Sequence, residues 1–249
     1  MILKVFESIE SLGRAAAEMF VQHAIRAIAH NGKFSVALSG GNTPRYMYGN
    51  LVKPEFKDRV PWEKVYIFWG DERCVSLDSD DNNAHNAFEQ FLNKVPIVPS
   101  HIHRIKSDKA PREAARNYES MLRKHFGNRA PEFDLVFLGL GENGHTASLF
   151  PGTPVLKDKE HLAAAVYVEK LRMYRVTLTP VIINQAQHIV FLVTGHNKAS
   201  AAHEVIEGTY APEQLPAQLI KPASGELYWL LDKDAASLLK EKSRETAAL

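Results

Sequence analysis

The sequence contains a single cysteine, Cys74, among 249 residues. One thiol cannot form a disulfide within the chain and excludes a zinc site built from several cysteines; it agrees with a reducing compartment. The sequence also lacks the roughly 18-residue apolar run of a membrane-spanning helix, and its amino terminus lacks the basic and then apolar pattern of a signal peptide. We therefore expect a soluble, cytoplasmic protein that does not bind membranes.

An excess of charge of either sign is also absent. Lys and Arg total 30 and Asp and Glu total 29, which gives a net charge of +1. Nucleic acids and anionic membranes attract strongly basic surfaces, so the composition predicts neither partner. Internal repeats, low-complexity segments and long linkers are missing as well. We expect residues 1–249 to form one domain with a sizeable core and without an obligate protein partner.

Short apolar runs alternate along the chain with stretches of helical periodicity. The apolar runs predict strands at residues 3–6, 34–38, 65–69, 133–138, 162–168, 173–178, 188–193 and 227–231. The helical stretches are residues 9–28, 46–51, 84–92, 112–126, 197–206 and 235–239. Such alternation predicts a doubly wound α/β fold, in which a mainly parallel sheet has helices on both faces. The order of the strands does not follow from the sequence.

One segment joins a buried-strand pattern to a glycine-rich loop that carries a histidine: residues 133–151, FDLVFLGLGENGHTASLFP. Gly139, Gly141 and Gly144 allow positive φ angles and a close approach of the backbone to a ligand. His145 follows them. Open α/β sheets bind ligands at the carboxyl ends of their strands, so His145 is well placed for chemistry. A histidine that only completes a turn is the alternative.

Three more segments of similar character separate a predicted strand from a helix. Residues 39–44, SGGNTP, could hold a phosphate with backbone N–H groups and hydroxyls, or could form a simple tight turn. They match neither the Walker loop nor the dinucleotide-binding fingerprint. Residues 70–73, GDER, could grip a phosphate through Arg73 or could form a surface ion pair. Lys198 lies in the last segment, and the four loops at one sheet edge together favour a site for an anion.

Several other reactive side chains fit ordinary structural roles. His101 and His103 have a spacing seen in metal ligands, but no carboxylate or cysteine partner is evident, so we expect a surface loop. The three tryptophans are expected to pack in the interior. Ser148 does not lie in a GxSxG nucleophile elbow and is not assigned as a nucleophile.

The motifs SGGNTP, WGDER, GLGENGHTASLFPG, RVTLTP and GHNKA occur in this order, and with PASGELYWLLD they resemble the 6-phosphogluconolactonase family of the pentose phosphate pathway. The resemblance covers nearly the whole chain from residue 39 onward. It implies hydrolysis of 6-phospho-D-glucono-1,5-lactone to 6-phosphogluconate, with His145 as general base and without a metal or other cofactor. It implies that the phosphosugar is bound by Gly40, Gly41, Asn42, Thr43, Asp71, Arg73, Asn83, Gly144, Arg175 and Lys198.

Glucosamine-6-phosphate deaminases share this broad fold and supply the main alternative, an aldose-ketose isomerase. They usually follow the histidine with a supporting glutamate, and Phe150 occupies that position here. A non-catalytic sugar-phosphate sensor is a third hypothesis, which the presence of His145 opposes. The chain departs from the lactonase pattern at Asn143, where aspartate is common. Arg175 could approach the phosphate or the lactone, or it could point outward from an edge strand.

Overall fold

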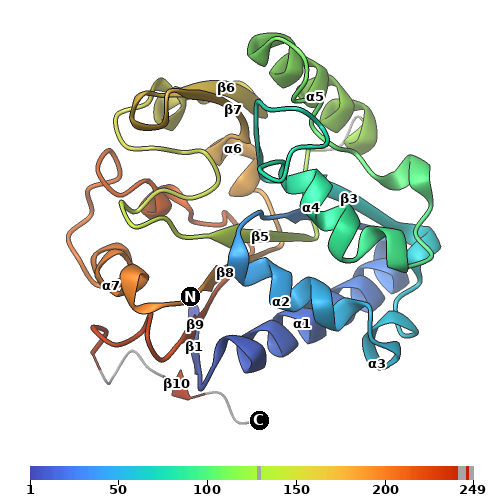
Figure 1. Ribbon diagram of the computed structural model, residues 1–249, viewed down its shortest axis with the longest axis horizontal. Helices are drawn as coiled ribbons and strands as arrows, with labels where there is room; N and C mark the ends of the chain where they lie inside the picture. Colours follow the sequence, from blue (N-terminus) through green and yellow to red (C-terminus); the bar gives the residue numbers. More distant parts are fainter. Residues whose placement is uncertain (128–129, 241–244, 247–249) are drawn as a thin grey trace.

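The structure, a computed structural model, describes residues 1–127, 130–240 and 245–246. A seven-stranded parallel sheet forms its centre, with the strand order β10-β1-β9-β8-β5-β2-β3 (Figure 1). The strands are β1 (Ile2–Phe6), β2 (Phe34–Leu38), β3 (Val65–Trp69), β5 (Leu135–Gly139), β8 (His188–Val193), β9 (Glu226–Asp232) and β10 (Glu245–Thr246).

A second, antiparallel sheet contains β4 (Asp71–Arg73), β7 (Met173–Leu178) and β6 (Ala163–Val168), in that order. Gly70 joins the two sheets, because its N–H donates to the Leu38 carbonyl and its own carbonyl accepts from the Leu178 N–H, both at 2.8 Å. Residues 70–73 were predicted to form a loop, and this prediction is wrong for residues 71–73, which form the strand β4. Three charged residues have no apolar periodicity, and only the distant partner β7 makes them a strand.

Helices cover both faces of the parallel sheet, as the alternation predicted; Figure 1 shows α1 and α2 below β5, and α5 with β6 and β7 above it. They are α1 (Ile9–Asn31), α2 (Asn42–Leu51), α3 (Pro54–Lys57), α4 (Asn83–Gln90), α5 (Pro111–Phe126), α6 (Pro180–Ile183) and α7 (Ala199–Ile206). The helix predicted at residues 235–239 is wrong. The Asp232 carboxylate accepts from the Ala235 N–H at 2.8 Å, and a series of turns follows.

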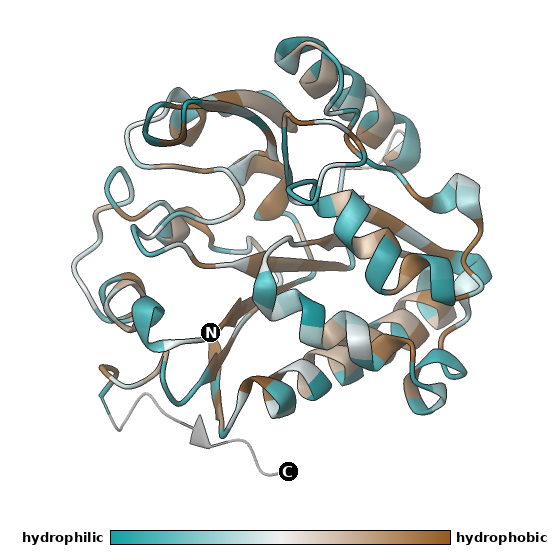
Figure 2. Ribbon diagram, in the orientation of Figure 1, coloured by the Kyte–Doolittle hydropathy of each residue, from teal (hydrophilic) through white to brown (hydrophobic). Residues whose placement is uncertain are grey.

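The core explains why the central strands have unbroken apolar runs. All five residues of β2 are buried, as are Leu135 to Leu138 of β5, because helices or the second sheet cover each face. The three tryptophans are buried, as predicted. Figure 2 shows hydrophobic residues on the central strands and hydrophilic ones on the outer turns of the helices. In the described parts of the chain, no helix has the length and apolar character needed to cross a membrane.

The strand order reverses its direction at β2 and β5. After β2 the chain moves to β3 on one side, whereas after β5 it moves in the opposite direction to β8 and then β9. Ligands of open α/β sheets bind where the order of the strands reverses in this way. The loops that follow β8, β5, β2 and β3 are consequently neighbours, and they are the four loops predicted to share a site.

Candidate functional site

His145 is oriented by contacts with two neighbouring side chains. Its Nδ1 lies 2.5 Å from the Asn143 Oδ1, and its ring stacks on Phe150 with the ring centroids 4.0 Å apart and the planes at 19°. An amide oxygen can only accept a hydrogen bond, so this contact assigns the proton to Nδ1. The other ring nitrogen, Nε2, keeps its lone pair and can accept a proton.

Gly141 makes room for the imidazole ring. A Cβ atom at position 141 would lie 2.0 Å from the Cε1 and Nδ1 atoms of His145. The Gly141 N–H also donates to the His145 carbonyl at 2.8 Å, which closes the loop around the histidine. The close contact with His145 therefore requires a glycine at position 141, although its φ is not positive.

The surroundings of His145 keep its ring neutral. Burial lowers the pKa of His145 to about 4 from its ordinary value of 6.5. The Asp71 carboxylate acts in the opposite direction, whereas Arg175, Lys198 and Arg73 lower the pKa further. At neutral pH the imidazole is thus in the form that can act as a general base.

Asp71 is the centre of a buried polar cluster next to the histidine. It is 7% exposed; its Oδ2 accepts from the Ser148 hydroxyl at 2.6 Å and lies 3.6 Å from an Arg175 Nη1. The Asn83 Nδ2 donates to the Asp71 carbonyl at 2.9 Å and lies 3.4 Å from its Oδ1. The Arg175 side chain is only 12% exposed on β7, the middle strand of its sheet, so an outward arginine on an edge strand is the wrong alternative.

Arg73 and Arg175 lie directly opposite each other on β4 and β7. Like charges at such positions repel, so this pair favours an anion between or beside the two guanidinium groups. The Nε atom of each arginine is buried and without a hydrogen-bond partner, although an Arg73 Nη1 donates to the Asp81 carbonyl at 2.6 Å. Buried donors of this kind are costly unless a ligand or a water molecule accepts from them.

Glu72, between these charged residues, has a structural role. Its carboxylate accepts from the backbone N–H groups of Arg73, Asn83 and Ala84 at 2.7–2.9 Å, and so holds the first residues of α4. Burial raises the pKa of Glu72 to about 7, against the effect of these hydrogen bonds. The carboxylate thereby positions Asn83.

The loop after β2 packs against the same cluster. A Cβ atom at Gly40 would lie 1.9 Å from the Asn83 Oδ1, so the loop fits tightly over that side chain. Gly41 precedes α2, and no side chain caps this helix, which leaves the N–H groups of its first turn, at Asn42 and Thr43, available to an anion. The Thr43 Oγ1 lies 2.7 Å from that of Thr194, the residue after β8.

Lys198 reaches the site from the loop after β8. It lies 3.7 Å from the Glu142 Oε1, and the neighbouring Asn197 Nδ2 donates to the same oxygen at 2.6 Å. Glu142 therefore joins the loops after β5 and β8. The structure brings together the four loops that the sequence singled out, whereas the contributions of Ser148 and Phe150 had no local sequence signal, because they depend on neighbours in the folded chain.

His101 ends a short 3-10 helix (Pro99–His101), and His103 lies in the irregular segment after it. Both are partly buried: His101 stacks on Tyr66 with centroids 3.9 Å apart, and His103 stacks on Phe68 at 4.6 Å. The part of the chain that the structure describes contains no group of three or more His, Cys, Asp or Glu residues that could hold a metal ion.

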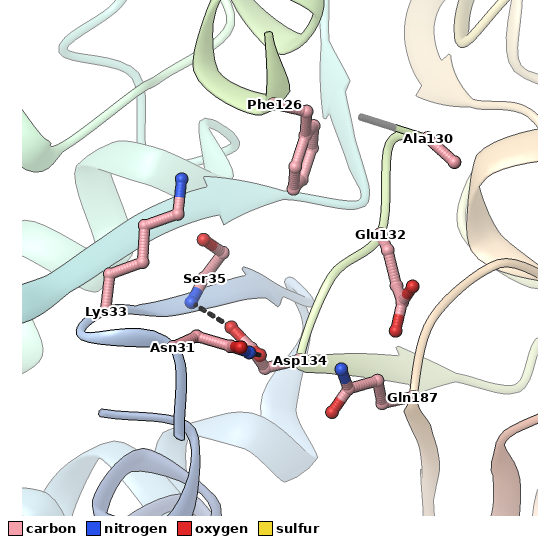
Figure 3. Close-up of a pocket in the computed structure, with 8 residues that line it drawn as sticks. All are labelled: Asn31, Lys33, Ser35, Phe126, Ala130, Glu132, Asp134 and Gln187. Carbon is pink, nitrogen blue, oxygen red and sulfur yellow. Dashed lines mark hydrogen bonds between the residues drawn. The ribbon is translucent and has the colours of Figure 1, made fainter. Parts of the chain in front are cut away.

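A cavity of about 200 Å³ lies at the opposite ends of the same strands (Figure 3). Its lining includes Lys33 and Ser35 at the start of β2, Asp134 just before β5 and Gln187 just before β8. The Asp134 carboxylate accepts from the Ser35 N–H at 2.7 Å and ties the two strands together. None of the four loops reaches this end, so we do not place the functional site here.

Comparisons with known proteins show to which family the chain belongs. The family model described as glucosamine-6-phosphate isomerases/6-phosphogluconolactonase matches residues 7–229. A 6-phosphogluconolactonase of Synechocystis sp. is 42% identical over 219 residues, which cover 86% of this chain and 88% of the relative. A probable 6-phosphogluconolactonase 1 of Arabidopsis thaliana is 36% identical over 95% of this chain and 93% of its own length.

Solved structures share the fold over nearly the whole chain. The 6-phosphogluconolactonase from Trypanosoma cruzi has a TM-score of 0.84 at 26% identity, covering 96% of this chain and 97% of its own. A monomeric glucosamine-6-phosphate deaminase has a TM-score of 0.79 at 22% identity, covering 96% and 100%, and shows the fold alone. The doubly wound, mainly parallel α/β fold is thus confirmed, and the chain belongs to the glucosamine-6-phosphate isomerase/6-phosphogluconolactonase family.

Proposed function

We propose that the chain, acting as one α/β domain, hydrolyses 6-phospho-D-glucono-1,5-lactone to 6-phosphogluconate with His145 as general base. The observation that carries this proposal is a neutral imidazole with a free Nε2 beside Arg73, Arg175 and Lys198. A phosphorylated lactone matches such a site, because it offers an anion to the cations and an ester carbon to the base. Relatives that bear the name 6-phosphogluconolactonase support the same reaction.

The reaction consumes one water molecule and involves no oxidation or reduction. Nε2 of His145 takes a proton from water as the water oxygen attacks C1 and forms a tetrahedral intermediate. The bond between C1 and the ring oxygen then breaks, and the imidazolium returns its proton to that oxygen. The carboxylic acid product ionises at neutral pH. A well-placed general base contributes about 10²- to 10⁴-fold to such a rate.

Backbone N–H groups of the loop after β5 stabilise the negative oxygen of the intermediate in this proposal. Those of Gly141 and Gly144 already donate to carbonyls of the loop, at 2.8 and 3.0 Å. Leu140, Glu142 and Asn143 are therefore the candidate donors. Gly144, with φ of 74°, maintains the loop conformation that presents them.

The phosphate group is assigned to the other end of the substrate, at residues 40–43 and the first turn of α2. Arg73 and Lys198 supply positive charge to it. Asn83 and Asp71, which contact each other, keep the loop after β2 and Arg175 in place. Binding the phosphate away from C1 fixes the sugar ring against the base and so reduces the entropic part of the barrier.

Phe150 favours lactone hydrolysis over the aldose-ketose isomerase reaction. Its ring stacks on His145 where a supporting carboxylate would be needed, so the histidine has an apolar neighbour. The test uses fresh lactone and follows 6-phosphogluconate through a coupled dehydrogenase, with ammonia release from glucosamine 6-phosphate measured in parallel. We expect lactone opening in proportion to protein concentration. A rate equal to spontaneous opening would refute the proposed function.

We expect Arg73→Ala and Lys198→Ala to raise KM by about tenfold or more, because each removes a charge-assisted contact with the phosphate. The kcat should change much less, since neither residue exchanges a proton with the reacting atoms. Steady-state kinetics at two ionic strengths measure both effects, and added salt should weaken wild-type binding more than that of the variants. A loss confined to kcat would contradict a role in phosphate binding.

We expect Asn143→Asp to raise the pKa of His145, because a carboxylate beside Nδ1 favours the imidazolium. The general base must be neutral, so the acid limb of kcat/KM should move upward, by about one pH unit. The pH dependence of kcat/KM measures this shift. Asn143→Ala is the matched control: it should lower kcat through lost orientation without moving the limb upward. An unchanged profile for Asn143→Asp would mean that position 143 does not tune the base.

A further inference from the structure

We propose that Ser148 is a positioning residue whose hydroxyl holds the Asp71 carboxylate so that Arg175 remains available to the substrate. This inference rests on the proposed function and assigns a role to a residue that the reaction itself does not use. Ser148 has no exposed surface and lies between His145 and Phe150 in the chain. Its hydroxyl donates to the Asp71 Oδ2 at 2.6 Å, which is short for a hydrogen bond and typical of a charged acceptor.

The backbone fixes the position of this hydroxyl. The Ser148 N–H donates to the Thr177 Oγ1 at 3.1 Å, and the Thr177 hydroxyl donates in turn to the Leu178 carbonyl at 2.9 Å. The preceding residue, Ala147, has φ of 47°, in the left-handed region that side-chain-bearing residues rarely adopt. A strained residue is retained where the surrounding contacts need it, and here it delivers Ser148 to Asp71.

The Asp71 carboxylate has two charged or polar partners: it accepts a hydrogen bond from the Ser148 hydroxyl and forms a looser ion pair with Arg175. Its Oδ2 lies 3.6 Å from an Arg175 Nη1, beyond hydrogen-bond distance, and the Arg175 Nε remains buried without a partner. Arginine and carboxylate readily form a bidentate pair when both are free to do so. Without the Ser148 hydroxyl, the carboxylate would turn toward Arg175, form that pair and occupy the donors that an anionic substrate needs.

Arg175 is placed where such a loss would be felt at the reacting centre. Its guanidinium carbon lies 5.4 Å from the centre of the Phe150 ring, and that ring stacks on His145. A series of neighbouring side chains thus leads from Ser148 through Asp71, Arg175 and Phe150 to the base. Because Ser148 itself is buried beneath Asp71, it acts on the substrate through these neighbours.

Ser148→Ala tests the proposal. We expect affinity for 6-phosphogluconate, measured by calorimetry, to fall about tenfold, the effect typical of losing a hydrogen bond to a charged group. The KM for the lactone should rise by the same factor, while kcat changes less. Thr179→Val is the matched control: Thr179 is also fully buried and donates to the His161 carbonyl at 2.6 Å, without contact to Asp71. The Thr179→Val variant should equal wild type in its affinity for 6-phosphogluconate and in its KM for the lactone.

A double variant distinguishes positioning through Asp71 from a general structural effect. In an Asp71→Asn background, Ser148→Ala should cause no further loss of affinity, because the carboxylate that it orients is gone. The proposal would be overturned if the two substitutions reduced affinity independently, so that their effects multiplied in the double variant. It would also be overturned if Ser148→Ala alone kept the wild-type affinity. Ser148→Cys, which keeps the size but donates weakly, should give an intermediate loss and replaces the alanine variant if thermal melting shows that the latter does not fold.

The outcomes separate this inference from the proposed function. If wild type neither opens the lactone nor binds 6-phosphogluconate, the function and the inference fail together. If wild type does both and Ser148→Ala behaves in the same way, only the positioning role is refuted.

Discussion

Replacing His145 with glutamine should lower kcat for lactone hydrolysis by about 10²- to 10⁴-fold, the contribution typical of a general base. Glutamine can still donate and accept hydrogen bonds, but it cannot take a proton from water at neutral pH. His145 itself does not contact the phosphate in the proposed complex, so KM should change only a few-fold. The variant therefore separates the chemical step from substrate binding.

The measurement needs the spontaneous opening of the lactone subtracted at every pH. His161→Gln is the control, because His161 is an exposed histidine whose Nδ1 lies 2.9 Å from an Asp158 oxygen and which has no role in the proposed reaction. We expect this control to match wild type. If His145→Gln kept the wild-type kcat, another group would have to activate the water, and the assignment of His145 would be refuted.

The sequence predicted those parts of the fold that depend on local pattern. Leu135 to Leu138 and the residues of β2 have apolar runs because both faces of these strands are covered, and this burial is visible in composition alone. The four loops were found for a similar reason, since glycine and polar residues that interrupt such runs mark strand ends.

Other parts depend on pairs of residues that are distant in the chain. Arg73 and Arg175 face each other only because β4 pairs with β7, and no property of residues 71–73 predicts that pairing. The stacking of Phe150 on His145 and the bond from Ser148 to Asp71 likewise arise from the folded loop. The sequence could therefore nominate the charged residues of the site but not the contacts that orient them.

Acidification from pH 7 to pH 5 should destabilise the fold strongly, because several histidines are buried in their neutral form. Burial lowers the pKa of His23 to about 4, and that of His125 to about 3. His23 stacks on His188 with centroids 4.0 Å apart, and the His125 Nε2 lies 2.8 Å from the Ser35 hydroxyl. In the unfolded chain these histidines titrate near pH 6.5.

Between pH 6.5 and pH 4 the unfolded chain binds more protons than the folded chain does. The stabilisation of the folded state is therefore complete above pH 6.5 and decreases as the pH falls. For His23 alone this lowers the free energy of unfolding at pH 5 by about 2 kcal/mol, and His125 and His145 add to the loss. Urea denaturation at pH 7 and at pH 5 measures this change in the free energy of unfolding. His23→Leu should remove its share of the pH dependence, whereas His30→Gln, an exposed position on the same helix, should keep the wild-type slope. Equal slopes for all three proteins would mean that His23 is protonated without cost in the folded chain.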